Sequence, residues 1–320
     1  MKSPFAWLAH LAGSPPVPAQ AGSIEEYWSA HRAELGRWET PIDGAIAGGF
    51  AADRLGFAFA AGYHAALRAL VPSLEPGAPT GLGATEAGGA HPRAIRSTLT
   101  AAPQGGFLLS GEKRWSTLAS LATGLLVVAS AGTRDTGQNL LRMVRVRTDA
   151  PGVAITQLPT TPFAPEIPHC VVTLDAVAVA DTEVLPGDGY ADYLKPFRTL
   201  EDLHVHAALL AYFVAVARRA GFPRDVVERA LALLAAARTL ASGPPAAPEL
   251  HVALGGLLEA TARLLEASSA HWAQAEPAER QRWERDQPLL SVASGARQAR
   301  LARAWATLSG EELAQTAEGE

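Results

Sequence analysis

Two short polar segments of this chain carry side chains that could hold a flat polar ring. The first begins Thr85-Glu86-Ala87-Gly88-Gly89, and the second ends Trp115-Ser116-Thr117. The residues between them alternate like two antiparallel strands, with a turn at Pro103-Gln104-Gly105. Trp115 can cover the face of a ring, while the hydroxyls of Ser116 and Thr117 can donate hydrogen bonds at its edge. The segment therefore predicts a site for a planar polar group.

A second group of chemically capable residues lies in Leu200-Glu201-Asp202-Leu203-His204-Val205-His206. Glu201 and His204 are three residues apart, and Asp202 and His206 are four apart, so in a helix each pair shares one face. An acid beside a histidine can relay a proton, but solvated helix faces carry ordinary ion pairs of the same spacing. Both interpretations stay open from the residues alone.

Composition places these segments in a folded globular protein. The chain has 320 residues, of which 48% are hydrophobic and 18% charged, and this length suggests about two domains. The formal net charge of −5, with no run of Lys or Arg, argues against a nucleic-acid surface. A single cysteine, Cys170, excludes an intramolecular disulfide and a cysteine-rich metal site. In its apolar strand, Cys170 is expected to be a core residue.

The sequence also predicts a soluble, cytoplasmic protein. No signal peptide is evident, because the apolar patch after Met1-Lys2-Ser3 is short and is broken by Pro15-Pro16. The longest apolar runs, Leu121 to Ala131 and Ala207 to Ala217, are too short to span a bilayer.

The periodicity of apolar residues predicts helices, then strands, then helices. Residues 1–22 are expected to be irregular, Ser23-Ile24-Glu25-Glu26 has the spacing of a capping box, and the helix that follows ends near Leu35. One buried helix is expected over residues 46–70, with glycines that allow close helix contacts. From residue 82 to 184 the period is two, which predicts an antiparallel barrel or sandwich. The strands predicted in that part are 97–101, 106–115, 125–129, 140–146, 153–158 and 170–174.

Helices return after Gly187-Asp188-Gly189. They are predicted over residues 190–220 (with an interruption at Pro196), 224–240, 250–273 and 288–308, and the tail after Gly310 is expected to fray.

The motif residues resemble the acyl-CoA dehydrogenase family. That family carries Thr-Glu-Pro-Gly-x-Gly-Ser-Asp and, later in its β-domain, Gly-x-Lys-x-Trp-Ile-Thr. Here Thr85-Glu86 and Gly111-Glu112-Lys113-Arg114-Trp115-Ser116-Thr117 match them, and phrases at residues 149–153, 173–179 and 185–190 also fit. The resemblance covers roughly residues 80–220. It implies an α+β, acyl-CoA dehydrogenase-like fold with a shortened N-terminal helical domain (1–79), a flavin-binding β-domain (80–187) and a truncated C-terminal helical bundle (188–320).

The resemblance also implies a set of cofactor contacts to FAD. Thr85 would contact the flavin ring, with backbone atoms from Gly83 and Ala84, while Trp115 and Thr117 would pack on the ring and hydrogen-bond near its reactive nitrogen. The chain departs from the pattern at Ser116, where the family has an apolar residue. It also has His91 where the family has the serine that helps bind the substrate or cofactor tail. His91 could instead contact a phosphate or a different substrate, or it could be a solvated loop histidine.

The implied reaction is α,β-dehydrogenation of an acyl thioester or a related substrate, with hydride transfer to the flavin. Glu201 or Asp202 falls where a smaller group of the family places its catalytic base. The resemblance further implies a dimer and an electron-transfer flavoprotein as acceptor. The family's later Gly-Gly-Tyr-Gly stretch is missing, the phenylalanine of its Arg-x-x-Phe-Gly segment is absent at 238–243, and His251 stands in place of a glutamine. Two alternatives therefore remain: a non-catalytic or half-site subunit of a hetero-oligomer, and a flavin-dependent monooxygenase of the same fold.

Overall fold

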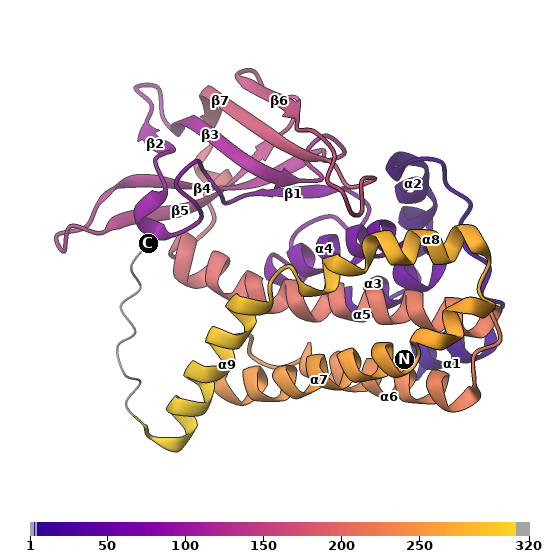
Figure 1. The fold of residues 1–320 in the computed structure, drawn as a ribbon. Helices are drawn as coiled ribbons and strands as arrows, with labels where there is room; N and C mark the ends of the chain where they lie inside the picture. The colour runs from indigo at the N-terminus through magenta and orange to yellow at the C-terminus, as the bar shows by residue number, and fades with distance from the viewer. Residues whose placement is uncertain (1–2, 4, 312–320) are drawn as a thin grey trace.

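The computed structural model describes residue 3 and residues 5–311 of the chain. A curled β-domain lies above a layer of helices, and the chain passes from N-terminal helices through the β-domain into C-terminal helices (Figure 1). The helical–β–helical order predicted from the sequence is therefore confirmed. The expected fraying after Gly310 concerns residues that lie largely outside the described part of the chain.

The N-terminal part consists of α1 (Ala6–Gly13), α2 (Ile24–Leu35), α3 (Pro41–Ala51) and α4 (Leu55–Leu70). Ser23 caps α2 by accepting a hydrogen bond from the Glu26 N–H, as its spacing predicted. The prediction of an irregular lead-in was wrong for α1, whose Trp7 and Leu11 are buried in the main core. The single helix predicted over 46–70 was also wrong, because the chain is extended at Ala52 and Arg54 and forms two helices.

The β-domain is one curled seven-stranded sheet, in agreement with the predicted β-barrel or sandwich class. Its strands are β1 (Thr80–Gly83), β2 (Thr98–Ala101), β3 (Phe107–Thr117), β4 (Gly124–Thr133), β5 (Asn139–Arg147), β6 (Val153–Gln157) and β7 (His169–Val179). The order along the sheet is β1-β4-β2-β3-β7-β6, with β5 paired to β4. Most pairs are antiparallel, but β1 pairs with β4 in parallel, so the predicted all-antiparallel arrangement is correct only in part.

The C-terminal part begins with a π-helical turn, η3 (Gly189–Leu194), that runs directly into α5 (Lys195–Arg219). Pro196 lies in the first turn of α5, where a missing N–H costs nothing, so it interrupts no helix. The remaining helices are α6 (Arg224–Leu240), α7 (Pro248–Ala267), α8 (Pro277–Asp286) and α9 (Ser294–Ser309), with short turns η4 (Ser269–Gln274) and η5 (Gln287–Ser291). Helix α8 was not predicted from the sequence, and η5 and α9 lie where a single helix was predicted.

Helix α5 is the central helix of the molecule, and two glycines let its neighbours approach it closely. A Cβ added to Gly62 of α4 would lie 2.5 Å from Val205 Cα, and one added to Gly49 of α3 would lie 2.0 Å from the Ala208 carbonyl oxygen. Either substitution would push the helices apart. The prediction that glycines allow close helix contacts is therefore confirmed at these two positions. The segment Gly189–Arg219 is long and apolar enough to cross a membrane, but 94% of its apolar window is buried inside this protein.

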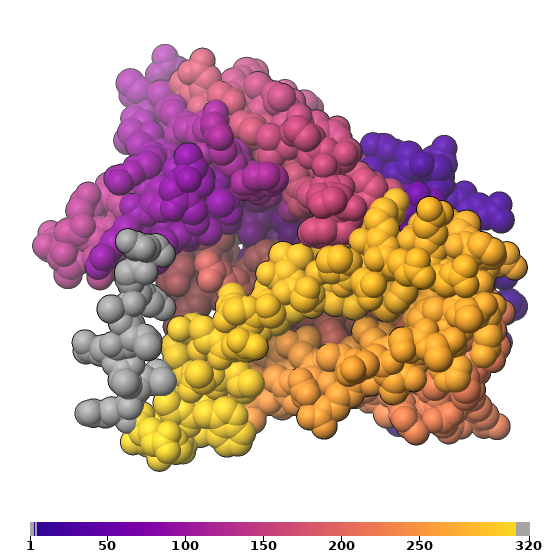
Figure 2. Space-filling model, in the orientation of Figure 1, coloured from indigo at the N-terminus to yellow at the C-terminus, as the bar shows by residue number. Residues whose placement is uncertain are grey.

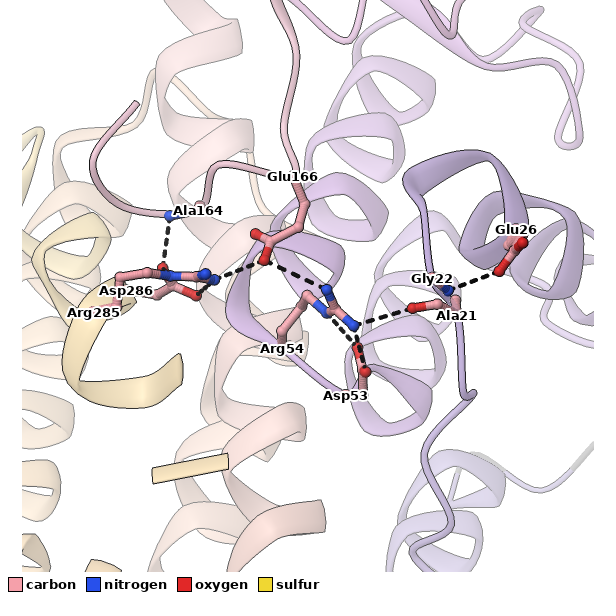
Figure 3. Close-up of polar contacts among 9 residues, drawn as sticks. All are labelled: Ala21, Gly22, Glu26, Asp53, Arg54, Ala164, Glu166, Arg285 and Asp286. Carbon is pink, nitrogen blue, oxygen red and sulfur yellow. Dashed lines mark hydrogen bonds and ion pairs between the residues drawn. The ribbon is translucent and has the colours of Figure 1, made fainter. Parts of the chain in front are cut away.

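A network of charged side chains ties three distant segments together (Figure 3). Arg54, between α3 and α4, pairs with Asp53 at 2.8 Å and with Glu166 at 3.5 Å. Arg285 of α8 bonds the same Glu166 oxygen at 2.7 Å, and Asp286 accepts the Ala164 N–H at 2.7 Å. Because Ala164 and Glu166 lie in the loop between β6 and β7, the network anchors that loop to helices on both sides.

Candidate functional site

The Trp115 side chain is displayed by a bulge in β3. Lys113 pairs with Val172 and Ser116 with Cys170 on β7, so Arg114 and Trp115 together oppose a single residue. Trp115 adopts φ +58°, a left-handed conformation that is uncommon outside glycine, and its side chain is 58% exposed. Such a strained, exposed aromatic residue at a bulge is typical of a binding site. Thr117 follows on the same strand and is part-buried.

The structure brings the two motifs predicted from the sequence into contact. The Arg114 N–H donates to the Thr85 carbonyl oxygen at 2.9 Å. Lys113, which precedes Arg114, is fully buried. Its Nζ donates to Oε1 of Glu86, the residue after Thr85, at 2.6 Å. One backbone hydrogen bond and one buried ion pair therefore hold the Thr85 segment against the strand that carries Trp115.

Glu86 is a residue that the sequence analysis did not assign to the site. Its carboxylate also accepts the N–H groups of Arg96 and Ser97 and the Ser97 hydroxyl, at 2.7 to 3.0 Å. Burial raises the pKa of Glu86, but the hydrogen bonds from Lys113 and the backbone outweigh it and hold the pKa below its ordinary value. Glu86 directly follows Thr85, and Lys113 directly precedes the bulge at Arg114 and Trp115. These two positions, an acid and a base next to the two motifs, are the sequence signal that could have identified the Glu86–Lys113 ion pair.

The other predicted cofactor residues occupy different surroundings. Gly83 is buried against Lys113, since a Cβ there would lie 3.0 Å from Lys113 Cγ. Ala84 packs on the main core. Ser116 is 1% exposed, and its hydroxyl has no hydrogen-bond partner among the described residues, so it lies inside the domain while Trp115 lies outside it. His91 is exposed, and its Nδ1 accepts the Arg93 N–H at 3.2 Å as the cap of η1 (Pro92–Ala94).

Glu201 lies on the face of α5 that is turned toward α4 and β1. Burial, and then the negative charge of Glu201, raise the pKa of the Tyr63 hydroxyl in α4, so the Glu201 carboxylate lies near this hydroxyl. The main chain of Leu82 in β1 is hydrogen-bonded to the same hydroxyl. Phe197, one turn earlier, meets the Tyr63 ring edge to face at 5.8 Å. Since Leu82 precedes Gly83, this places Glu201 where the two helical parts and the β-domain motif meet.

The electrostatic surroundings of Glu201 suit a proton acceptor. Burial, and then the neighbouring Asp202 carboxylate, raise its pKa from 4.5 to about 7, while arginines nearby oppose the shift. Among the described contacts, no hydrogen bond or ion pair engages the Glu201 carboxylate. A carboxylate with these properties can take a proton near neutral pH.

Asp202 lies on a different face of α5, and both of its carboxylate oxygens are paired with arginines. Arg297 of α9 donates to it at 2.8 Å, and Arg300 of the same helix pairs with its other oxygen. His206 on this face is bonded to Thr261 of α7 at 2.8 Å, and His204 Nδ1 contacts the Leu200 carbonyl at 2.7 Å. The acid–histidine pairs suggested by the spacing are not among the contacts of these described side chains.

A cavity of about 1200 Å³ lies on the Asp202 side of α5, between α7, α8 and α9. Leucines and the indoles of Trp272, Trp283 and Trp305 form much of its wall, with His206 and Arg297 at one end. Thr85, Trp115 and Glu201 do not line this cavity. Figure 2 shows a separate hollow of the surface between the β-domain and the α8–α9 segment, with part of α5 at its floor.

Comparison with known proteins agrees with this geometry. Residues 81–177 match the family model for the acyl-CoA dehydrogenase middle domain. This part of the chain is therefore similar to the β-domain of acyl-CoA dehydrogenases. The match spans β1 to β7, and so it contains both motifs and the bulge at Trp115.

Several solved structures share the fold at low sequence identity. Butyryl-CoA dehydrogenase from Megasphaera elsdenii is 15% identical, with a TM-score of 0.65 over 96% of this chain and 93% of that chain. Glutaryl-CoA dehydrogenase from Mycobacterium smegmatis is 13% identical, with a TM-score of 0.66 over 96% and 93%. FMN-bound TdsC from Paenibacillus sp. A11-2 is 18% identical, with a TM-score of 0.59 over 91% and 85%. No curated protein sequence matches the chain.

Proposed function

We propose that this protein is a flavin-dependent oxidoreductase that removes hydrogen from the α and β carbons of an acyl thioester or a related substrate, with Glu201 as the base. One observation carries the proposal. Of the two adjacent carboxylates on α5, Glu201 is the one that faces the motif-bearing β-domain, and it has a pKa of about 7 and no ion-pair partner among the described residues.

The residues around Trp115 fit a flavin. An exposed indole can cover the face of an isoalloxazine ring, and the Thr117 hydroxyl on the same strand can reach the ring's edge. The pair Glu86–Lys113 fixes the Thr85 loop against this strand, so that both motifs present a rigid surface to the ring. A bound flavin would supply the hydride acceptor that no protein side chain can provide. FAD is the cofactor we propose, with FMN, which is bound in TdsC, as the form to test beside it.

The role of Glu201 follows from its position and its pKa. As a carboxylate it would take the proton from the carbon next to the thioester carbonyl, while the hydride leaves from the neighbouring carbon. The burial that raises its pKa also strengthens it as a base. Butyryl-CoA and glutaryl-CoA dehydrogenases share the fold, which supports acyl thioesters as the first substrates to test.

The test is the visible spectrum of the purified protein, followed by titration with FAD and with FMN. We expect flavin bands close to one per chain, and bleaching of those bands when acyl thioesters are added without oxygen. A screen of thioesters that differ in acyl length then defines the substrate, and an electron-transfer flavoprotein is the acceptor to add. Flavin binding without bleaching by any thioester would contradict the dehydrogenase and direct the test to oxygen consumption with reduced flavin.

The half-site alternative gives a different result in the same experiment. Protein that stays colourless at micromolar flavin, and turns yellow only with a related chain, would contradict a self-sufficient enzyme. The family positions that suggested this alternative have other partners here, since Arg238 pairs with Asp43 at 2.6 Å and His251 contacts Thr199 at 3.2 Å.

A further inference from the structure

His169 lies beside the proposed ring site without belonging to either motif. It is the first residue of β7, paired in register with Thr117 of β3. Its Nδ1 lies 3.2 Å from Thr117 Oγ1, and its ring meets the Trp115 indole at an edge-on angle of 67° with centroids 6.3 Å apart. One imidazole therefore touches both side chains that are proposed to contact the flavin.

The backbone around His169 is fixed on both sides. Its carbonyl oxygen accepts the Leu158 N–H at 2.8 Å, and the Pro168 carbonyl oxygen accepts the Leu118 N–H at 2.8 Å. Three residues earlier, Glu166 is held by Arg54 and Arg285, so the loop that leads to His169 is anchored by the network of Figure 3. A side chain on so constrained a backbone can orient its neighbour.

The Thr117 hydroxyl can donate only one hydrogen bond, either to His169 or to a bound ligand. A hydroxyl has a single proton to donate, and in the structure its donor contact within the chain is the Trp115 carbonyl oxygen, at a long 3.5 Å. If Nδ1 of His169 carries no proton, it is a hydrogen-bond acceptor, and the Thr117 hydroxyl donates its proton to Nδ1. If His169 carries its proton on Nδ1, Thr117 accepts that hydrogen bond and keeps its own proton for an external acceptor.

We propose that His169 is a positioning residue of the flavin site: its Nδ1–H donates to Thr117 Oγ1, and this directs the Thr117 hydroxyl proton to an acceptor at the edge of the flavin ring. The inference rests on the proposed function. Burial lowers the pKa of His169, which keeps the imidazole neutral, with one donor and one acceptor nitrogen, at neutral pH. The edge contact with Trp115 holds the ring plane in which Nδ1 reaches Thr117.

Three variants separate the hydrogen bond from the ring contact. H169F keeps an aromatic ring against Trp115 but has no donor. H169N loses the ring but keeps an N–H near the Nδ1 position, and T117V removes the hydroxyl with little change of volume. Each variant is compared with the wild type by thermal melting, by the dissociation constant for FAD, and by the position of the flavin absorption bands.

We expect H169F and T117V each to weaken FAD binding by about two- to tenfold and to shift the flavin bands in the same direction. The double variant H169F/T117V should bind no more weakly than T117V alone, because in the proposal His169 acts only through the Thr117 hydroxyl. H169N should recover most of the affinity and the wild-type spectrum. ¹⁵N spectra of the histidines should show a proton on Nδ1 of His169.

Two results would overturn the inference while leaving the flavin site intact: H169F with wild-type affinity and spectrum, or effects of H169F and T117V that add. A His169 ring protonated only on Nε2 would overturn it as well, and that measurement needs no bound flavin. A wild-type protein that binds neither FAD nor FMN would instead overturn the proposed function, and this inference with it.

Discussion

The two faces of α5 show how neighbouring carboxylates acquire opposite roles. Glu201 faces α4 and β1, where it lies near a buried tyrosine and forms no ion pair with any described residue, and its pKa rises to about 7. Asp202 faces α9, where two arginines surround it. In our proposal the first face provides a proton acceptor at the junction with the β-domain, while the second binds the C-terminal helices to the core. The difference teaches that the partners brought by the fold decide whether the pKa of a buried acid rises.

Removing the Glu201 carboxylate should have the largest effect. For E201Q we expect the rate of flavin reduction by an acyl thioester to fall by about 10²- to 10⁴-fold, because the amide cannot take the proton. Flavin binding and thermal stability should be retained. The measurement is anaerobic stopped-flow absorbance, and wild-type rates should rise with pH through about 7 as Glu201 ionises. A variant as fast as the wild type would remove Glu201 from the mechanism.

Removing the Asp202 charge should affect stability rather than chemistry. D202N leaves Arg297 and Arg300 without their carboxylate, and breaking a buried pair of this kind costs about 3 kcal/mol. Urea denaturation measures the loss, and the folded variant should still be reduced by thioester. A stable D202N protein with no reduction would reverse the assignment of the two faces.

The free energy of unfolding should depend on pH through Glu201. Its folded pKa lies above its ordinary value, so the folded state binds the proton more tightly, and this contribution is lost as pH rises from about 4.5 to 7. Relative to E201Q, the wild type should therefore become less stable over that range, by up to about 3 kcal/mol. Urea titrations of both proteins at several pH values measure the difference. Parallel curves for the two proteins would show that burial does not shift this carboxyl.

The Asp202 face should show the reverse dependence through His206. Burial, and then Arg297, lower the pKa of His206 to about 3, so the folded state rejects a proton that the unfolded chain accepts. Stability contributed by the neutral ring is present above about pH 6.5 and falls by about 1 kcal/mol per pH unit below it. H206Q can keep a hydrogen bond to Thr261 and should flatten this acid slope, with little effect at pH 7. The same slope in both proteins would contradict the prediction.

Local patterns in the sequence determined the β-domain and its motifs. Alternating apolar residues, turns and the segments Thr85-Glu86 and Trp115-Ser116-Thr117 are short-range signals. They located the strands and carried both the family resemblance and the proposal of a ring site. The spacing at Ser23 likewise determined the start of α2. Such features depend on neighbours within a few residues, and the tertiary structure preserves them.

The tertiary structure alone decided which groups become buried partners. One step along a helix turns a side chain by about 100°, so only the packing of α4 and α9 against α5 separates Glu201 from Asp202. The charged helix α8 was missed because its carboxylates are buried through partners far away in the sequence, such as Asp286 with the Ala164 N–H. The contacts of Lys113 and His169 were not predicted from the sequence for the same reason, because their partners lie far away in the chain. A sequence pattern records the polarity of a residue, but the cost of burying a charge is settled by the partner that the fold brings to it.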